Sequence, residues 1–134
     1  MTILSKILAF FLSILMTLFP SLFPKNDIDK DFVTDGKSLV INLDSNPTTG
    51  YSWSFDISDE TVIRFVKSEY TETGTGIGAG GRDSFRFIGL SEGTAEINFT
   101  YSQQWTEDPA ANTAQFKIAV DKNGNITVES YEIR

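Results

Sequence analysis

Apolar and polar residues alternate along most of the chain after residue 36, and this period of two predicts β-strands rather than helices. Leu39, Ile41 and Leu43 form the first apolar row. Further rows have the same spacing: Tyr51, Trp53, Phe55 and Ile57; Phe85 and Phe87; Ala95, Ile97, Phe99 and Tyr101; Phe116, Ile118 and Val120. Because successive side chains of a strand point to opposite faces, each row is expected to face a common core.

The rows predict strands at residues 38–44, 51–57, 61–70, 82–90, 95–101, 116–120 and 126–133, after a short strand near residues 31–34. The strand at 61–70 alternates less cleanly, so its core positions are either Ile63 and Phe65 or Val62 and Val66. Residues 121–124 contain Asn-Gly, which predicts a tight primed hairpin turn. The predicted fold is all-β, an antiparallel β-sandwich of about seven to eight strands.

The connections between these strands fall into two groups. Each connection of an antiparallel sandwich carries the chain to the opposite end, so connections separated by two strands share an end. Residues 45–50, 71–81 and 102–114 are therefore predicted at one end, and the short connections at 58–60, 91–93 and 121–124 at the other. Long loops in a compact domain are usually functional. The first group is the predicted binding end.

The first loop at this end holds the sequence Asn46-Pro47-Thr48-Thr49-Gly50-Tyr51. Pro47 fixes its own φ and biases Asn46 toward an extended conformation. Gly50 can supply a positive φ before the next strand. These restraints predict a stiff, protruding loop that presents the hydroxyls of Thr48 and Thr49. The same residue types are common in ordinary turns, so turn chemistry alone leaves a plain connection as an equal alternative.

The second loop is rich in glycine and ends in Gly78-Ala79-Gly80-Gly81. Missing side chains leave backbone amides open, which lets another chain approach closely. A flexible linker between strands is the competing interpretation. A phosphate-binding loop is disfavoured because no Gly-Lys-Ser/Thr follows and no helix is predicted to begin there.

The third loop contains Trp105, which lies beyond the alternating row that ends at Tyr101. Its neighbours are polar and turn-forming: Gln103, Gln104, Thr106, Glu107, Asp108 and Pro109. An exposed tryptophan is a favoured anchor of protein interfaces. The alternative is that Trp105 folds back and caps the sandwich.

Residues 1–24 differ in composition from the rest of the chain. Lys6 is the only charged residue before Lys25, and residues 7–19 are almost unbroken Leu, Ile and Phe. That run is shorter than the about 20 residues of a membrane span and suits the core of a signal peptide, whereas residues 3–23 are long enough for a retained anchor. Residues 1–24 are therefore predicted to be a signal peptide or signal anchor, followed by one domain at 25–134. The domain is expected to be exported (secreted, periplasmic or in a secretory or lysosomal lumen) or anchored outside the cytoplasm.

Composition removes several classes of function. The 134 residues include no Cys and no His, which excludes Ser-His and Cys-His nucleophilic sites and the common zinc sites. The acidic residues are scattered and form no calcium loop, so neither a metal nor a cofactor is expected. A net charge of −7 without a basic cluster argues against nucleic acid as a partner.

The three loops together resemble the chagasin family of cysteine-protease inhibitors. The resemblance covers roughly residues 35–121 and rests on Asn46–Tyr51 followed by Trp53, on Gly-x-Gly-Gly at 78–81, and on a Trp in the third loop. The third family motif is Arg-Pro-Trp, whose places here hold Gln103, Gln104 and Trp105. The chain therefore departs from the family at the Arg and the Pro.

The resemblance implies an immunoglobulin-like antiparallel β-sandwich. It also implies a chagasin-like inhibitor domain at 25–134 that blocks papain-like cysteine proteases reversibly and competitively, without catalysis of its own. In such an inhibitor the first loop enters the active-site cleft and the other two loops contact its sides. The implied protease-binding residues are Asn46, Pro47, Thr48, Thr49, Gly50, Tyr51, Gly78, Ala79, Gly80, Gly81, Gln103, Gln104 and Trp105.

Two other functions compete with protease inhibition. A cell-surface adhesion or carbohydrate-binding sandwich would also use shaped loops and an exposed Trp, but it does not require the Asn46–Tyr51 sequence. A carboxylate-based hydrolase would need two acids about 5–10 Å apart, and no such pair is evident in the sequence. The expected partner is a papain-like cysteine protease. The domain is expected to be monomeric and to meet a membrane only through residues 1–24.

Overall fold

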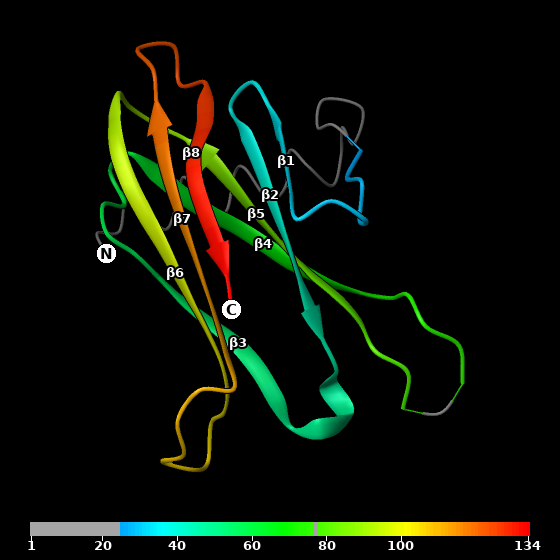
Figure 1. The fold of residues 1–134 in the computed structure, drawn as a ribbon. Coiled ribbons are helices and arrows are strands. Elements are labelled where there is room, and N and C mark those ends of the chain that lie inside the picture. The colour runs from blue at the N-terminus through cyan, green and yellow to red at the C-terminus, as the bar shows by residue number, and fades with distance from the viewer. Residues whose placement is uncertain (1–24, 77) are drawn as a thin grey trace.

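The computed structural model describes residues 25–76 and 78–134, which fold into eight strands (Figure 1). Their bounds are β1 Phe32–Asp35, β2 Ser38–Ser45, β3 Tyr51–Ile57, β4 Ile63–Glu72, β5 Gly81–Gly89, β6 Gly93–Gln103, β7 Asn112–Val120 and β8 Ile126–Ile133. The predicted signal peptide or anchor at residues 1–24 lies outside the described residues. Within residues 25–76 and 78–134, no helix has the length and the hydropathy that a membrane span requires.

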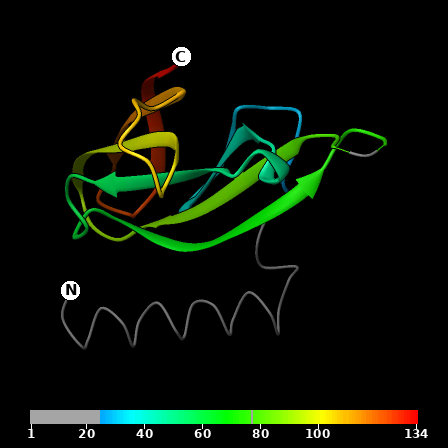
Figure 2. The same cartoon turned by 90° about the horizontal axis from the view of Figure 1, so that it is seen from below.

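The strands form two antiparallel sheets that pack face to face (Figures 1 and 2). The first sheet has the order β1-β2-β5-β4 and the second the order β3-β6-β7-β8. Every pairing is antiparallel. Four pairings join consecutive strands through short connections, whereas β2-β5 and β3-β6 join strands that are not consecutive. The predicted all-β sandwich is confirmed.

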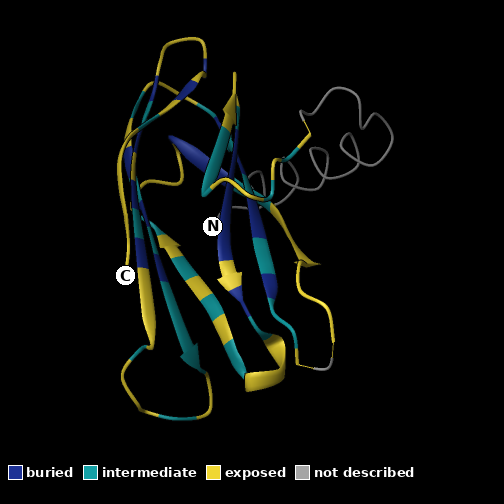
Figure 3. Ribbon diagram, turned by 45° about the vertical axis from the view of Figure 1, so that its right-hand side comes forward, coloured by how far each residue is buried: buried dark blue, intermediate teal, exposed yellow. Residues whose placement is uncertain are grey.

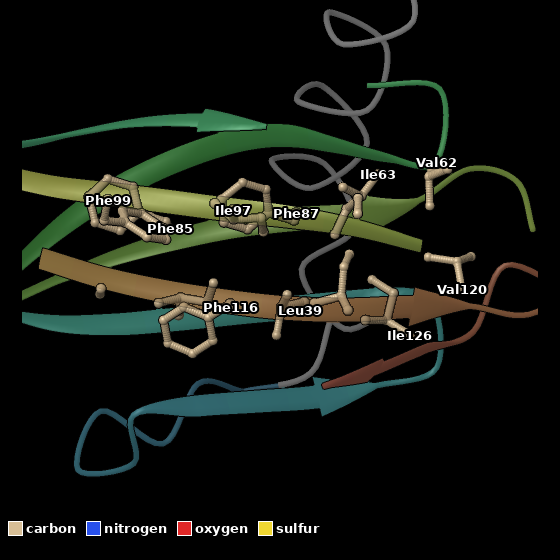
Figure 4. Close-up of a cluster of buried hydrophobic side chains, with 14 of the residues drawn as sticks. Leu39, Val62, Ile63, Phe85, Phe87, Ile97, Phe99, Phe116, Val120 and Ile126 are labelled. Atoms are coloured by element: carbon tan, nitrogen blue, oxygen red, sulfur yellow. The ribbon is translucent and has the colours of Figure 1, made fainter. Parts of the chain in front are cut away.

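Aromatic side chains from both sheets fill the space between them (Figure 4). Phe99 of β6 is 1% exposed and contacts aromatic rings of both sheets. Its ring centroid is 5.1 Å from that of Phe85 and 6.1 Å from that of Phe116. Dark blue segments in Figure 3 mark the buried rows of the inner strands. Most outward positions between them are more exposed, but Val40 and Asn42 of β2 and Ser84 of β5 are buried as well. The alternating rows of the sequence therefore do define the core.

A β-bulge in β4 explains why this strand alternates poorly. Phe65 pairs with Phe87 of β5, but the next pair is Lys67 with Arg86, so Val66 is an extra residue without a partner. Ile63 and Phe65 face the core within the strand. Val62, from the competing set, is also buried, but it lies in the turn just before β4.

The turn between β7 and β8 is not the tight primed turn that Asn-Gly predicts. A primed turn of the Asn-Gly type needs positive φ at both central residues. Among the described residues only glycines have positive φ, and Gly124, at φ 86°, is one of them. The Gly124 N–H donates to the Asp121 carbonyl, and the Asp121 N–H donates to the Asn125 carbonyl. The hairpin thus has a three-residue loop with glycine at its left-handed position.

β8 lies beyond the part of the chain that resembles the chagasin family, and its aromatic residue closes one side of the sandwich. The Tyr131 ring stacks on Phe116 at 5.3 Å and meets the edge of Phe32 at 5.2 Å. Phe32 belongs to β1, so Tyr131 connects the edge strands of the two sheets. The C-terminal hairpin therefore covers the core between β1 and β7.

Residues 25–31 cross the outer face of β2 and are fastened there by a buried asparagine. Asn42 is 0% exposed, and its amide donates to the Asn26 side chain at 3.0 Å and to the Lys30 carbonyl at 2.8 Å. Its carbonyl oxygen accepts from Ser84 at 2.6 Å. Arg82 adds an ion pair with Asp31 at 3.0 Å. This segment, the N-terminal strap (residues 25–31), is part of the folded domain.

Removing most of the strap is expected to destabilise the domain. A protein beginning at Asp31 loses the bonds from Asn42 to Asn26 and Lys30 but keeps the bond from Ser84. Water must replace the lost partners, so we expect a loss of about 1–2 kcal/mol in the free energy of unfolding. The corresponding drop in melting temperature is about 5–10 °C for a domain of this size. Calorimetry on this protein and on a reference beginning at Lys25 measures the difference. Equal melting temperatures would show that the N-terminal strap contributes nothing measurable to the stability of the domain.

Candidate functional site

Three loops lie at one end of the sandwich, as counting the strands predicts (Figures 1 and 3). They join β2 to β3, β4 to β5 and β6 to β7. The second and third are shorter than predicted because β4 extends to Glu72, β6 extends to Gln103, and β7 begins at Asn112. The longer strands carry the loops out from the core on paired backbone.

The first loop is a single turn of 3-10 helix, Pro47–Thr49, held at both ends. Asn46 precedes it in an extended conformation, with φ −138° and ψ 94°, and its side chain accepts the Thr48 N–H at 3.2 Å. Gly50 follows with φ 80°, and its N–H donates to the Pro47 carbonyl. The geometry is that of an asparagine cap at the start and a left-handed glycine at the end.

The hydroxyls of Thr48 and Thr49 donate within the loop, which differs from the prediction that the loop presents them. Thr48 Oγ1 donates to Asn46 Oδ1 at 2.7 Å, and Thr49 Oγ1 donates to the Asn46 carbonyl at 2.7 Å. Both residues are exposed, so a partner would meet their methyl groups and remaining oxygen lone pairs. Sequence reasoning missed this because Asn46 lies two and three residues earlier and its side-chain direction is not visible in the sequence.

Asn46 also ties the first loop to the second loop and to the sheet below. Its Nδ2 donates to the Gly78 carbonyl at 3.0 Å. Its backbone N–H donates to the Tyr101 hydroxyl at 2.9 Å. Tyr101 is the last residue of its apolar row, and it stacks on Tyr51 at 5.4 Å. Its place at the end of the row was the signal that it reaches the loops, although nothing in the sequence assigned it a role in the site.

The second loop uses its glycines for different reasons. Gly78 has φ 78°, and a side chain there would meet nothing within 4 Å. A Cβ on Gly80 would lie 3.2 Å from the Ser45 carbonyl of the first loop. A Cβ on Gly81 would overlap the Thr71 carbonyl, and Gly81 is buried in β5. Gly78 and Gly80 are thus at the rim, whereas Gly81 is required by close strand packing.

The third loop lies against the first. Gln103 Nε2 donates to the Thr49 carbonyl at 3.3 Å. Trp105 is 71% exposed, and the six-membered ring of its indole covers the α-carbon of Gly50. Trp105 therefore does not cap the core, which was the alternative to an exposed anchor. Gln104 is exposed, and its side chain donates to the Ser102 hydroxyl at 3.3 Å.

A hollow of about 450 Å³ separates the first and second loops. Its lining includes Asn46, Gly74, Gly80 and Tyr101. Asp44 also lines the hollow, and Trp53 of the other sheet is joined to this residue because its Nε1 donates to the Asp44 carbonyl at 2.9 Å. In the described residues, no group of three or more Asp or Glu side chains is placed to hold a metal ion.

Asp83 is an acidic residue on the inward face of β5, below the loops. It is two residues from Phe85, so both share a face, and it pairs in register with Leu43 and Tyr70. Burial raises the pKa of its carboxyl above the ordinary value of 3.8, and a hydrogen bond from Ser45 partly opposes this shift. The charged form is therefore disfavoured in the folded protein.

Replacing Asp83 with Asn is expected to change how stability depends on pH. A carboxyl with a raised pKa holds its proton more tightly in the folded chain, so its charge weakens folding as pH rises through the folded-state pKa. Asp83→Asn should therefore gain stability relative to the natural chain at roughly pH 7 and gain nothing at roughly pH 3, below the unfolded-state pKa. Urea unfolding at both pH values measures this difference. A gain of the same size at both would argue against titration of Asp83.

Comparison with known proteins assigns the family. Residues 33–120 match the profile described as chagasin family peptidase inhibitor I42. The chain belongs to the chagasin family. Proteins of this family are peptidase inhibitors and not enzymes. The resemblance expected from the three loop sequences is therefore confirmed at the level of the family.

The chagasin-family relatives match most of the sandwich. Chagasin of Trypanosoma cruzi is 29% identical over 96 residues, covering 68% of this chain and 86% of that protein. Amoebiasin-1 of Entamoeba histolytica is 33% identical over 90 residues, covering 66% of this chain and 85% of that protein. The solved structure of EhICP2, a cysteine protease inhibitor from Entamoeba histolytica, has a TM-score of 0.55 at 19% identity, covering 61% of this chain and 77% of that one. This last likeness supports the fold.

Proposed function

We propose that this chagasin-family domain inhibits papain-like cysteine proteases reversibly and competitively, by placing its three loops over the active-site cleft. The observation that carries the proposal is that the loops contact one another and form a single rim. Asn46 joins the first loop to the second, and Gln103 joins it to the third. The family consists of peptidase inhibitors, and the related EhICP2 is a cysteine protease inhibitor.

The geometry suits a competitive inhibitor that is not itself cleaved. A protease cleft accepts an extended chain, but residues 47–49 form a helical turn closed by internal hydrogen bonds. Such a loop can fill a cleft without offering an extended peptide bond for attack. Little ordering entropy is then lost on binding, because the loop is already held. A nanomolar inhibition constant needs about −12 kcal/mol, which three loops burying about 800 Å² could supply.

The test is a titration of the 25–134 domain against papain and a cathepsin-like enzyme. We expect the apparent KM to rise with inhibitor concentration while kcat stays constant, and activity to return on dilution. An increase in activity loss with time, or a cleaved inhibitor on mass spectrometry, would contradict reversible blocking. No inhibition at micromolar concentrations would rule out a general inhibitor of this enzyme class.

Within this proposal, Trp105→Ala is expected to weaken inhibition at least tenfold, which corresponds to about 1.4 kcal/mol. Trp105 exposes 71% of its surface beside the first loop, so its indole is available to a partner. The inhibition constant measures the effect, and an unchanged melting temperature provides the control for folding. If the variant inhibits as well as the natural domain, Trp105 does not contact the protease.

The proposed place of action is outside the cytoplasm. This part of the proposal rests on the composition of residues 1–24, which suits a signal peptide or a signal anchor. Expression of the full chain followed by fractionation and mass measurement of the domain tests export and cleavage together.

A further inference from the structure

Gly50 and Trp105 have an unusually close contact. Gly50 has φ 80°, and a Cβ built on it would overlap Cη2 of Trp105 and lie 2.9 Å from Cζ2. Real Cβ atoms essentially never approach another heavy atom within 3.0 Å. The indole therefore occupies the space that any other residue at position 50 would need for its side chain. Glycine adopts the positive φ without strain and lets the indole stay in place, whereas a Cβ would make the indole move.

Gln103 contacts Thr49, the residue before Gly50. It is the last residue of β6 and pairs with Tyr51, the first residue of β3, so the backbones of the two loops leave the sheet side by side. From this position its Nε2 donates to the Thr49 carbonyl at 3.3 Å. Two side chains of the third loop thus contact consecutive residues of the first loop. One does so by a hydrogen bond and the other by van der Waals contact.

These contacts restrain Trp105 as well as the first loop. The indole is 71% exposed and packs on the α-carbon of Gly50. A large exposed side chain that is free to rotate loses conformational freedom when it binds. Contact with Gly50 removes part of that freedom before a partner arrives.

We propose that Gly50 and Gln103 are positioning residues that hold the first and third loops, before binding, in the arrangement that binds the protease. In this arrangement the Trp105 indole packs on the α-carbon of Gly50. This inference rests on the proposed protease inhibition for its consequence, but the arrangement itself belongs to the free protein. It assigns Gln103, which stands where the family motif has Arg, a role inside the inhibitor. Trp105 then has one edge against Gly50 and the rest of its surface toward the protease.

A double-mutant comparison tests the coupling of Gly50 and Trp105. Gly50→Ala should weaken inhibition at least tenfold in the natural chain, because the methyl group displaces the indole. In a Trp105→Ala background the same change should weaken inhibition less than threefold, because the space above residue 50 is then empty. Equal fold-changes in both backgrounds would overturn the proposal, since they would show that Gly50→Ala acts through backbone strain alone.

Gly36→Ala is the matched control for that strain. Gly36 has φ 58° in the turn between β1 and β2, and its Cβ would meet only Asn125, at an ordinary 3.6 Å. It should lower the melting temperature slightly and leave inhibition unchanged. Gln103→Glu keeps the shape of the side chain but removes its amide donor, so it should weaken inhibition about three- to tenfold. Unchanged inhibition by this variant would remove Gln103 from the proposal.

A measurement without protease separates this inference from the proposed function. The chain has two Trp residues, so 5-fluorotryptophan labelling gives two fluorine resonances, and Trp105→Ala identifies the one from Trp105. Gly50→Ala should move that resonance toward the position of a solvent-exposed tryptophan, and Gly36→Ala should not. An unmoved resonance would show that the Trp105 indole does not pack on Gly50, and would overturn the proposal. If the resonance moves and no cysteine protease is inhibited, the proposed function fails but the positioning contact stands.

Discussion

Phe99→Ala is expected to lower the free energy of unfolding by about 3–5 kcal/mol, the largest stability effect expected of the substitutions considered for this chain. Phe99 is 1% exposed and lies where the two sheets meet. Its ring contacts five other aromatic rings, those of Trp53, Phe55, Phe85, Phe87 and Phe116. Since these neighbours come from both sheets, they cannot all move inward to fill the cavity. Most of the cost of the lost contacts therefore remains.

Phe65→Ala is the matched control for this prediction. Phe65 is only partly buried, lies next to the β4 bulge, and contacts two rings, Phe55 and Phe87. It should cost less than Phe99→Ala because solvent and the edge strand can adjust around the gap. Urea unfolding followed by tryptophan fluorescence measures both variants. Equal losses would indicate that the centre of the sandwich relaxes as readily as its edge.

The position of Phe99 could be predicted from the sequence, and the reason is the period of the strand. Ala95, Ile97 and Phe99 alternate with polar residues, and only one face of a strand can reach a core. The same reasoning fails at β4, where the bulge at Val66 changes the face on which later residues lie. Alternation predicts strands well wherever the register is continuous, and it cannot show where a residue is inserted.

The residue types in the turns predicted the structure less well than the alternation of apolar and polar residues in the strands. Asn123-Gly124 has the composition of a primed turn, but Asp121 accepts the N–H groups of Asn123 at 2.8 Å and Asn125 at 2.9 Å. These side-chain bonds accompany the longer loop, in which Asn123 keeps a negative φ. The sequence therefore predicted a hairpin at the correct place, and the carboxylate two residues earlier goes with a different turn type.

The candidate site, too, could be predicted only in part from the sequence. Counting strands predicted that the three loops share an end, because that depends only on the number of chain reversals. The contacts between the loops depend on side-chain directions, so the sequence did not show that Asn46 reaches Gly78 or that Trp105 covers Gly50. These contacts change the interpretation of the site. Because the three loops contact one another, a substitution in one loop is expected to change the conformation of the other two.

Asn46→Ala is expected to weaken inhibition about 100-fold, equivalent to about 2.7 kcal/mol, while the domain stays folded. The substitution removes three side-chain hydrogen bonds, two from Thr48 and one to the Gly78 carbonyl. Each is worth about 0.5–1.5 kcal/mol. Because the loop is exposed and its base is fixed by paired strands, the loss should fall on loop order and not on the core. Inhibition constants and melting temperatures measured together separate these two effects.

Asn46→Asp distinguishes the internal turn from the link between loops. Aspartate can still accept both hydrogen bonds from Thr48, but it has no donor for the Gly78 carbonyl and places a negative charge beside it. We expect an intermediate loss of about tenfold, because the turn survives and the second loop is released. A loss as large as that of Asn46→Ala would place most of the effect in the link to Gly78. If Asn46→Ala inhibits as well as the natural domain, the hydrogen bonds of the Asn46 side chain do not matter for binding. That result would contradict the proposal that loops held together by these bonds bind the protease.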